Sequence, residues 1–265
     1  MSDETESPAT ASGRGRRIII PSPQMGPLGR PVGRRIFLGL LAAGVAGMGA
    51  TKWLYRADDA DSNSVASAVR LGSMTPDDQE ALIGQHPNHN YTERFRYYSV
   101  GDIPNFNSRS WRLAVDGEGV NSNLSLRFDD VKAFPQYAVT ADFRCVNGWI
   151  VHNCIWIGVR VRDVVDAVSP NDRAKFVTFY SGDGVYTDSL TWAQARSDHA
   201  ILAWQLNGDP LIREQGYPLR LIYPDMYGYK NVKWLRRIEV KSTRDLGFWE
   251  QTGWEIDAYV YTPPS

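Results

Sequence analysis

Residues 138–161 read AVTADFRCVNGWIVHNCIWIGVRV, and this stretch predicts two strands separated by a short turn. The first strand ends at Cys145, and the glycine in the turn 147–149 lets another part of the backbone approach closely. The second strand passes into a helix whose valines share one face: Val161, Val164, Val165 and Val168. The stretch therefore presents a cysteine at the end of a strand.

The chain after residue 90 continues as short strands with few helices. We expect strands or hairpins in the segments 110–119, 124–135, 176–191, 200–211, 218–225 and 232–240. Short helices are expected where Asp129 and Thr191 serve as N-caps, and upstream where Thr75 precedes Pro76. The aromatic C-terminal stretch 247–264 is expected to wrap the domain surface. About eight short strands with few helices predict a β-rich α+β fold.

The N-terminal part differs in composition from the rest of the 265-residue chain. Residues 1–35 hold six arginines against three acidic residues and are rich in Pro, Gly and Ser, which predicts disorder. Residues 36–55 begin with sixteen uncharged residues, fewer than the about 20 of a full bilayer span. The polar, Asp-rich residues 56–89 are predicted to be a linker, and residues 90–265 the folded domain.

The pair Arg34-Arg35 stands directly before Ile-Phe-Leu, in the form RRxFL that is typical of a twin-arginine export signal. A plain membrane anchor with positive flanks is the alternative. No convincing A-x-A cleavage site follows, so an uncleaved, membrane-tethered signal stays open. In either case the chain after Lys52 is expected in the periplasm or on the outer face of the cytoplasmic membrane. The net charge of −1 gives no general reason to expect nucleic-acid binding.

The chain has two cysteines, Cys145 and Cys154, and their spacing leaves several kinds of chemistry open. A disulfide would suit an exported protein, but its Cα atoms have to come within about 7 Å. A zinc site that includes His152 lacks an evident fourth ligand, and a cysteine nucleophile lacks an evident base. Two buried structural cysteines are the plainest alternative. Arg144 favours a thiolate at Cys145, a soft ligand suited to a metal that already carries most of its coordination on a cofactor.

The segment 218–234, PLRLIYPDMYGYKNVKW, combines basic and aromatic residues around a glycine. Backbone N–H groups of such a loop, together with Arg220, Lys230 and Lys233, form a cradle for an anion. The alternative is a strand pair with solvated charges and aromatic packing. Neither GxxxxGK[ST] nor GxGxxG occurs, which argues against a nucleotide. A group with one phosphate and a flat polar ring system fits the segment better.

Together these segments resemble the molybdopterin-dependent oxidoreductases of the sulfite oxidase family. The resemblance is greatest to the small, single-domain bacterial type, similar to a periplasmic methionine sulfoxide reductase catalytic subunit. It begins at YTERFRYYSVGDIPNFNSRSWRLAVDG, runs through FRCVNGW and AKFVTFYSGDG, and ends with GYPLRLIYPDMYGYKNVKWLRRIEV. The resemblance implies a sulfite-oxidase-type molybdopterin-binding domain with mixed sheets over residues 90–265.

The resemblance also implies roles for single residues. Cys145 is expected to ligate molybdenum, and Trp149, Tyr227 and Tyr229 to line the catalytic pocket, with Trp156 in support. The implied cofactor-binding residues are Tyr97, Tyr98, Ser99, Cys145, Ser181, Gln215, Arg220, Lys230, Asn231, Val232 and Lys233. Gln215 and the stretch 152–154 depart from the usual family pattern, in the pterin contacts and at the substrate mouth. An arginine cluster typical of true sulfite oxidases is replaced by VNGW, which argues against sulfite as the substrate.

The expected function is oxygen-atom or two-electron transfer at a mononuclear molybdenum, on a small-molecule or sulfoxide-type substrate. The single cradle favours molybdopterin without an attached nucleotide. Because the sequence shows neither CxxCH nor an iron–sulfur cysteine set, we expect a membrane haem or quinone-linked electron-transfer subunit as partner. Two other functions stay open: an exported, non-catalytic β-rich binding module, and a thiol redox protein that uses Cys145 and Cys154.

Overall fold

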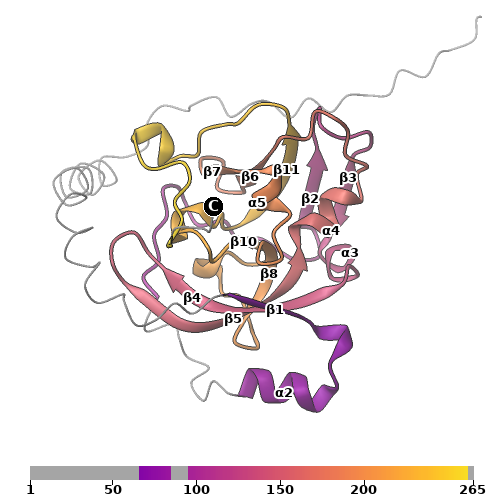
Figure 1. Ribbon diagram of the computed structural model, residues 1–265, viewed down its shortest axis with the longest axis vertical. Coiled ribbons are helices and arrows are strands. Elements are labelled where there is room, and N and C mark those ends of the chain that lie inside the picture. Colours follow the sequence, from indigo (N-terminus) through magenta and orange to yellow (C-terminus); the bar gives the residue numbers. More distant parts are fainter. Residues whose placement is uncertain (1–65, 85–94, 262–265) are drawn as a thin grey trace, which may run out of the picture.

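The computed structural model describes residues 66–84 and 95–261, which fold around two β-sheets (Figure 1). The larger sheet has the strand order β1-β4-β5-β8-β10, with β9 paired to β8, and every neighbouring pair is antiparallel. Its strands are β1 (Ser67–Arg70), β4 (Gln136–Arg144), β5 (Ile150–Arg160), β8 (Ile201–Leu206), β9 (Asp209–Pro210) and β10 (Arg220–Ile222). The long β4–β5 hairpin contains the predicted pair of strands in residues 138–161, and it carries Cys145 at its tip.

The second sheet is mixed, with the strand order β3-β2-β11-β6-β7. Strands β2 and β11 run parallel, and the other pairs are antiparallel. Its strands are β2 (Arg112–Asp116), β3 (Leu124–Arg127), β6 (Phe176–Ser181), β7 (Thr187–Thr191) and β11 (Leu235–Lys241). The chain therefore leaves the first sheet after β10 and enters the second at β11, and the loop between them crosses from one sheet to the other.

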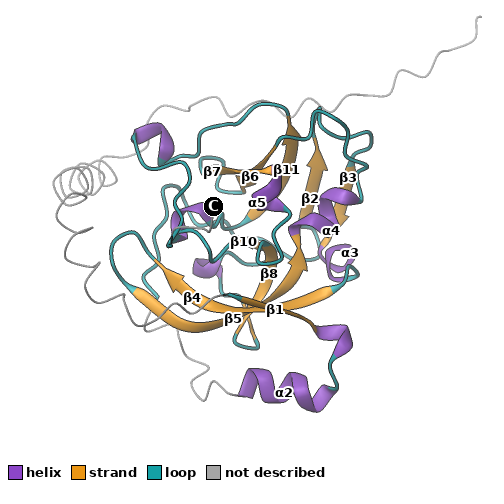
Figure 2. Ribbon diagram, in the orientation of Figure 1, coloured by secondary structure: helices purple, strands orange, loops and turns teal. Residues whose placement is uncertain are grey.

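Helices are short and lie at the edges of the sheets (Figure 2). They are α2 (Pro76–Gly84), α3 (Phe128–Lys132), α4 (Val161–Asp166), α5 (Trp192–Ala195) and the 3₁₀ turns Leu71–Ser73, Arg213–Gln215, Gly228–Lys230 and Glu250–Thr252. The β-rich α+β fold is thus confirmed. Thr191 caps α5 as expected, since its Oγ1 accepts from the Gln194 N–H. Helix α3 begins earlier than expected: Arg127 is its N-cap residue, because Asp130 at the third helical position accepts from the Arg127 N–H at 2.8 Å.

Apolar side chains form two clusters that use different faces of the larger sheet. The main core lies between the sheets and includes the predicted helical face of Val161, Val164, Val165 and Val168, all fully buried. A second cluster includes Phe95, Phe143, Cys154 and Trp156. Because Phe143 lies two residues before Cys145, the second cluster supports the tip of the hairpin, where the candidate site is located.

The folded domain begins further upstream than the predicted boundary at residue 90. Ser67–Arg70, inside the predicted linker 56–89, form β1 and pair with β4 from Ser67↔Thr140 to Arg70↔Tyr137. This short edge strand has mostly exposed side chains, so it lacks the apolar alternation that identifies a strand in sequence. The segments 1–35 and 36–55 lie outside the described residues, and within the described residues no helix is long and apolar enough to cross a membrane.

The C-terminal stretch lies across the second sheet and the loop between β10 and β11. Phe248 donates its N–H to the Thr187 carbonyl at 2.9 Å and stacks on Tyr186, with ring centroids 5.8 Å apart. Further along, the Tyr227 N–H donates to the Ala258 carbonyl at 2.9 Å. The described part of this stretch therefore wraps the domain as expected, and it braces the loop that leads to the basic segment.

Candidate cofactor-binding site

Cys145 follows β4 directly, in a tight turn closed by two backbone hydrogen bonds. The Gly148 N–H donates to the Cys145 carbonyl at 2.9 Å, and the Cys145 N–H donates to the Trp149 carbonyl at 3.0 Å. Gly148 has φ 87°, a conformation that a residue with a Cβ rarely adopts. The turn therefore folds Trp149 back beside the cysteine.

The two cysteines are free and differ in their surroundings. Cys145 is half-buried, whereas Cys154 is fully buried and its thiol donates to the Val151 carbonyl at 3.4 Å. Burial raises the pKa of the Cys154 thiol far above its ordinary value, so Cys154 behaves as a buried apolar side chain. No group of three or more His, Cys, Asp or Glu residues that would hold a metal ion occurs within residues 66–84 and 95–261.

Burial also raises the pKa of the Cys145 thiol, and nearby groups offset this shift in part. The offsetting groups are the Asn147 N–H, the guanidinium of Arg96 and the indole of Trp149. The expectation that Arg144 would favour the thiolate is not met. Its guanidinium points to Asp142 at 3.1 Å instead, because neighbouring side chains of a strand leave opposite faces. Sequence reasoning missed Arg96, which lies 49 positions away along the chain.

Asp142 organises the other face of the hairpin tip, and sequence reasoning missed it as well. Besides Arg144, it accepts from the Asn153 N–H at 3.0 Å and lies 3.0 Å from His152 Nδ1. Asn153 adopts φ 53° at an irregularity in the β4–β5 register. The bulge turns His152 toward a buried carboxylate, within the stretch 152–154 that was expected to depart from the family pattern.

Arg220 is a buried cation on β10 that lies beneath the aromatic side chains of the second cluster. Its guanidinium carbon lies 5.2 Å from the Trp156 ring and 5.6 Å from the Phe143 ring. It donates to the carbonyls of Gln215 at 2.8 Å and Asn231 at 3.3 Å, and among the described residues no carboxylate pairs with it. Burial lowers the pKa of Arg220 to about 9, which still leaves it charged at neutral pH.

Lys233 brings a second cation to the same place. Its ammonium donates to the carbonyls of Tyr98 at 2.7 Å and Glu214 at 3.1 Å, and within residues 66–84 and 95–261 it makes no ion pair. Burial, and then repulsion from Arg220, lower the pKa of Lys233 to about 7. Gly216 separates the two cations: a Cβ at this position would lie 3.1 Å from the Cβ atoms of both Arg220 and Lys233.

Most of the other predicted cofactor residues surround this pair of cations. Gln215 Nε2 donates to the Tyr97 hydroxyl at 3.4 Å, and burial raises the pKa of that phenol. Asn231 holds the connecting loop in shape, because its side chain accepts from the Tyr223 N–H and donates to the Tyr227 carbonyl. Val232 is buried and its carbonyl accepts from the Leu221 N–H at 2.8 Å.

Two predicted cofactor residues form local contacts close by. Ser181 ends β6, is buried, and accepts from the Asp183 N–H at 3.2 Å. Ser99 is exposed and donates to the Gly101 carbonyl at 2.5 Å. Tyr98 reaches the pair of cations through its backbone carbonyl, and its side chain is exposed.

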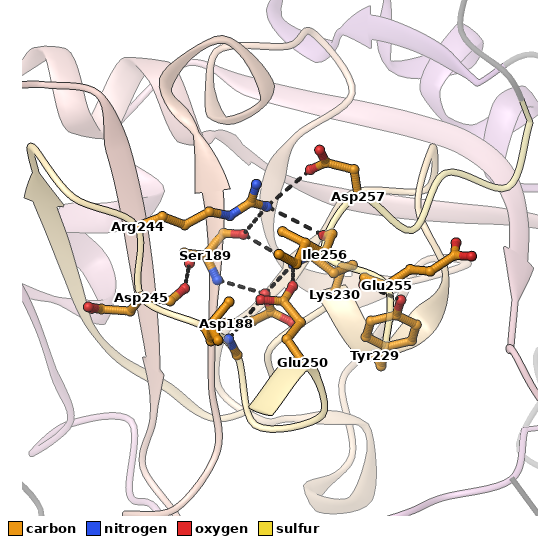
Figure 3. Close-up of polar contacts among 12 residues, drawn as sticks. Asp188, Ser189, Tyr229, Lys230, Arg244, Asp245, Glu250, Glu255, Ile256 and Asp257 are labelled. Carbon is orange, nitrogen blue, oxygen red and sulfur yellow. Dashed lines mark hydrogen bonds and ion pairs between the residues drawn. The ribbon is translucent and has the colours of Figure 1, made fainter. Parts of the chain in front are cut away.

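Lys230 and Tyr229 both contact the C-terminal stretch, where they lie beside Glu250 and Glu255 (Figure 3). The fully buried ammonium of Lys230 donates to the carboxylates of Asp188 and Glu250 and to the Ser189 carbonyl, so all three of its N–H groups are used. The Tyr229 hydroxyl donates to the Glu255 carbonyl at 2.7 Å. Lys230 therefore has no donor left for a phosphate.

Of the predicted pocket aromatics, Trp149 lies beside Cys145 in the same turn, whereas Tyr229 contacts the C-terminal stretch. Trp149 stacks on Phe143 with ring centroids 5.8 Å apart and an interplanar angle of 29°. The loop that carries Tyr227 lies against the same strand, since a Cβ on Gly228 would come within 2.8 Å of the Phe143 ring. The indole Nε1 of Trp149 is buried, and among the described residues it has no hydrogen-bond partner.

The site thus joins a half-buried thiol to a buried cation, Arg220, and a half-buried one, Lys233, which have no carboxylate partner among the described residues. Such cations are costly to bury alone and are neutralised by an anionic ligand. A thiol at the edge of the same pocket is a soft donor for a metal. The fold and the site together define a domain that fits a phosphate-bearing metal cofactor, and the residues present therefore suit molybdopterin.

Comparison with known proteins leads to the same class. The sequence model described as "Oxidoreductase molybdopterin binding domain" matches residues 100–249. The chain belongs to this family of molybdopterin-binding oxidoreductases. It is 36% identical over 187 residues to the uncharacterized oxidoreductase YuiH of Bacillus subtilis, covering 70% of this chain and 92% of YuiH.

More distant relatives have names that point to sulfur chemistry. The chain is 32% identical to the mitochondrial sulfite oxidase of Drosophila melanogaster over 71% of this chain, but it spans only 37% of that protein. It is 28% identical to the protein-methionine-sulfoxide reductase catalytic subunit MsrP of Campylobacter jejuni, covering 71% of this chain and 69% of MsrP. The sulfane dehydrogenase SoxCD of Paracoccus pantotrophus superposes with a TM-score of 0.51 at 25% identity, over 54% of this chain and 41% of that one.

Proposed function

We propose that Cys145 is the protein ligand of a mononuclear molybdenum held on molybdopterin, and that the enzyme transfers an oxygen atom or two electrons at this metal. The observation that carries the proposal is the position of Arg220 and Lys233 next to the aromatic cluster that supports Cys145. A buried and a half-buried cation, neither paired with a carboxylate of the described residues, match one phosphate group. A single cradle of this kind in the described residues favours the form of the cofactor without a nucleotide.

The chain's own residues have separate tasks in this proposal. Arg220 and Lys233 bind the phosphate and thereby hold that end of the cofactor in the pocket. Cys145 offers its sulfur from a turn that backbone hydrogen bonds keep rigid. Trp149 and Tyr227 line the mouth and exclude water, and the Trp156 ring packs on the Arg220 guanidinium. The bound cofactor supplies the redox chemistry.

A small-molecule or sulfoxide-type substrate suits the site better than sulfite does. After Cys145 the chain reads VNGW, which places an aromatic residue at the mouth where a cluster of arginines would serve an anion. Similarity to MsrP, a protein-methionine-sulfoxide reductase subunit, supports the same choice.

Export by the twin-arginine route, with residues 36–55 as signal or anchor, would bring the enzyme to a membrane haem or quinone-linked partner.

The experiment that tests the proposal compares Cys145→Ser with Cys154→Ser in protein produced with its own N-terminus. Molybdenum content is measured by elemental analysis, and activity with methionine sulfoxide and a reduced dye, or with sulfite and an oxidising dye. Cys145→Ser is expected to lose activity and the molybdenum–sulfur absorption. Cys154→Ser keeps a donor for the Val151 carbonyl and is expected to retain both. Unchanged absorption and activity in Cys145→Ser would overturn the role of Cys145.

A further inference from the structure

Trp149 packs against the second cluster, and its indole carries a buried polar atom that packing alone does not satisfy. Its ring stacks on Phe143 and meets Phe95 edge-on at 6.0 Å, so its orientation is fixed on both sides. Its Nε1 is buried and, within residues 66–84 and 95–261, is without a hydrogen-bond partner. A buried N–H that is left unpaired has lost its hydrogen bond to water without a replacement, so a tryptophan here calls for a partner in the working enzyme.

The backbone indicates which atom that partner is. Cys145 and Trp149 close one turn, with the cysteine N–H bonded to the tryptophan carbonyl at 3.0 Å. The turn folds the Trp149 indole back beside the Cys145 sulfur, although the free thiol does not meet hydrogen-bond geometry. An ionised sulfur is a much stronger acceptor than a thiol.

We propose that the indole N–H of Trp149 donates a hydrogen bond to the sulfur of Cys145 in the cofactor-bound enzyme, and that Trp149 is thereby a positioning residue that tunes this ligand. The inference rests on the proposed role of Cys145. Hydrogen bonds to a ligating cysteine withdraw electron density from its sulfur and are one of the means by which proteins set a metal's potential. Removing the N–H makes the sulfur a stronger donor, which stabilises the oxidised metal and lowers its potential.

The variant that tests the inference is Trp149→Phe, which keeps a ring on Phe143 and removes the N–H. The matched control is Trp192→Phe on α5, whose ring lies under Arg196 at 5.1 Å and packs against the main core, not against the cluster that includes Phe143 and Trp149. The holoenzymes are titrated electrochemically while the paramagnetic molybdenum signal is followed. In Trp149→Phe we expect the oxidised form to be favoured about tenfold more than in the wild type. This corresponds to a molybdenum potential lower by about 59 mV for a one-electron step. Trp192→Phe is expected to match the wild type.

Further variants separate this inference from the proposed function. Trp149→His retains a ring N–H, so its potential is expected to lie between those of Trp149→Phe and the wild type. If wild type, Trp149→Phe and Trp192→Phe have the same potential, the hydrogen bond is overturned. The ligand role of Cys145 then still stands, provided that Cys145→Ser abolishes the sulfur–molybdenum absorption. A change in KM alone, at unchanged potential, also overturns it and assigns the N–H to the substrate. If Cys145→Ser keeps that absorption, the ligand role itself is wrong.

A second measurement covers the case in which Trp149→Phe does not retain the cofactor. Protein with ¹⁵N-labelled indoles is compared without cofactor, with cofactor, and as cofactor-free Cys145→Ala. The Trp149 indole proton is expected to move downfield and exchange more slowly on cofactor loading. An indole resonance that is unchanged by loading contradicts the inference.

Discussion

The ammonium of Lys230 is fully buried against the carboxylate of Glu250, a residue 20 positions further along the chain. Asp188 of β7 binds the same ammonium from the other side, so the buried triad joins a strand, the loop between the sheets and the C-terminal stretch (Figure 3). The loop continues directly into Asn231 and Lys233. The triad therefore fixes the backbone directly before Asn231 and Lys233, two residues of the proposed cofactor site.

Replacing Lys230 with methionine is expected to destabilise the protein strongly. The variant leaves two buried carboxylates without their cation, and breaking a buried pair typically costs about 3–5 kcal/mol. Urea unfolding of cofactor-free protein gives the free-energy difference. The control is Arg173→Ala, which removes an exposed pair to Glu118 at 3.8 Å and should have a far smaller effect. Equal effects of the two variants would contradict a structural role for the triad.

The triad also predicts a pH dependence of stability. Burial, and repulsion from Glu250, outweigh the attraction of Lys230 and raise the pKa of Asp188 to about 7. The folded protein then holds a proton that the unfolded chain releases near pH 4, so this contribution to stability is present at low pH and is lost as the pH rises toward 7. Urea midpoints at pH 5 and pH 7.5 measure the loss. In Asp188→Asn the urea midpoint should fall less between these two pH values. A fall equal to that of the wild type would show that another group titrates.

Lys233 predicts how cofactor retention depends on pH. Its pKa of about 7 in the cofactor-free protein means that the ammonium loses its charge as the pH rises past neutrality. A phosphate binds the charged form, so we expect molybdopterin to be retained less well at pH 8.5 than at pH 6.5. Lys233→Arg keeps the charge at both values and should flatten the dependence. The measurement is the molybdenum content after dialysis at each pH. An equal change of molybdenum content with pH in the wild type and Lys233→Arg would contradict the role of Lys233 in binding the phosphate.

Gly216 and Gly253 form a matched pair for testing the cradle. Both end a 3₁₀ turn in the left-handed conformation, with φ 111° and 95°. A Cβ on Gly253 meets nothing within 4 Å, whereas a Cβ on Gly216 would press on Arg220 and Lys233. Gly253→Ala should therefore cost only the backbone strain, about 1 kcal/mol. Gly216→Ala should cost more and reduce molybdenum content several-fold, and identical losses in the two variants would refute the close approach of the cations.

Much of the fold follows from local sequence patterns. The β4–β5 hairpin, the turn at 147–149, the valine face of α4 and the Thr191 cap all rest on contacts between residues close in sequence, which is why their patterns predict them. The short edge strand β1 and the true start of α3 were missed, because polar residues carry little periodic signal there. Family membership also followed from four blocks of sequence in their order along the chain.

What the tertiary structure alone decided is the direction in which each charge points. Lys230 and Lys233 stand three positions apart and look equivalent in sequence, yet one lies between Asp188 and Glu250 and the other beside Arg220. Arg144 is next to Cys145 but turns to Asp142, while the distant Arg96 acts on the thiol. A buried charge is stabilised by groups that the fold brings from elsewhere in the chain, so its partner cannot be predicted from its sequence neighbours.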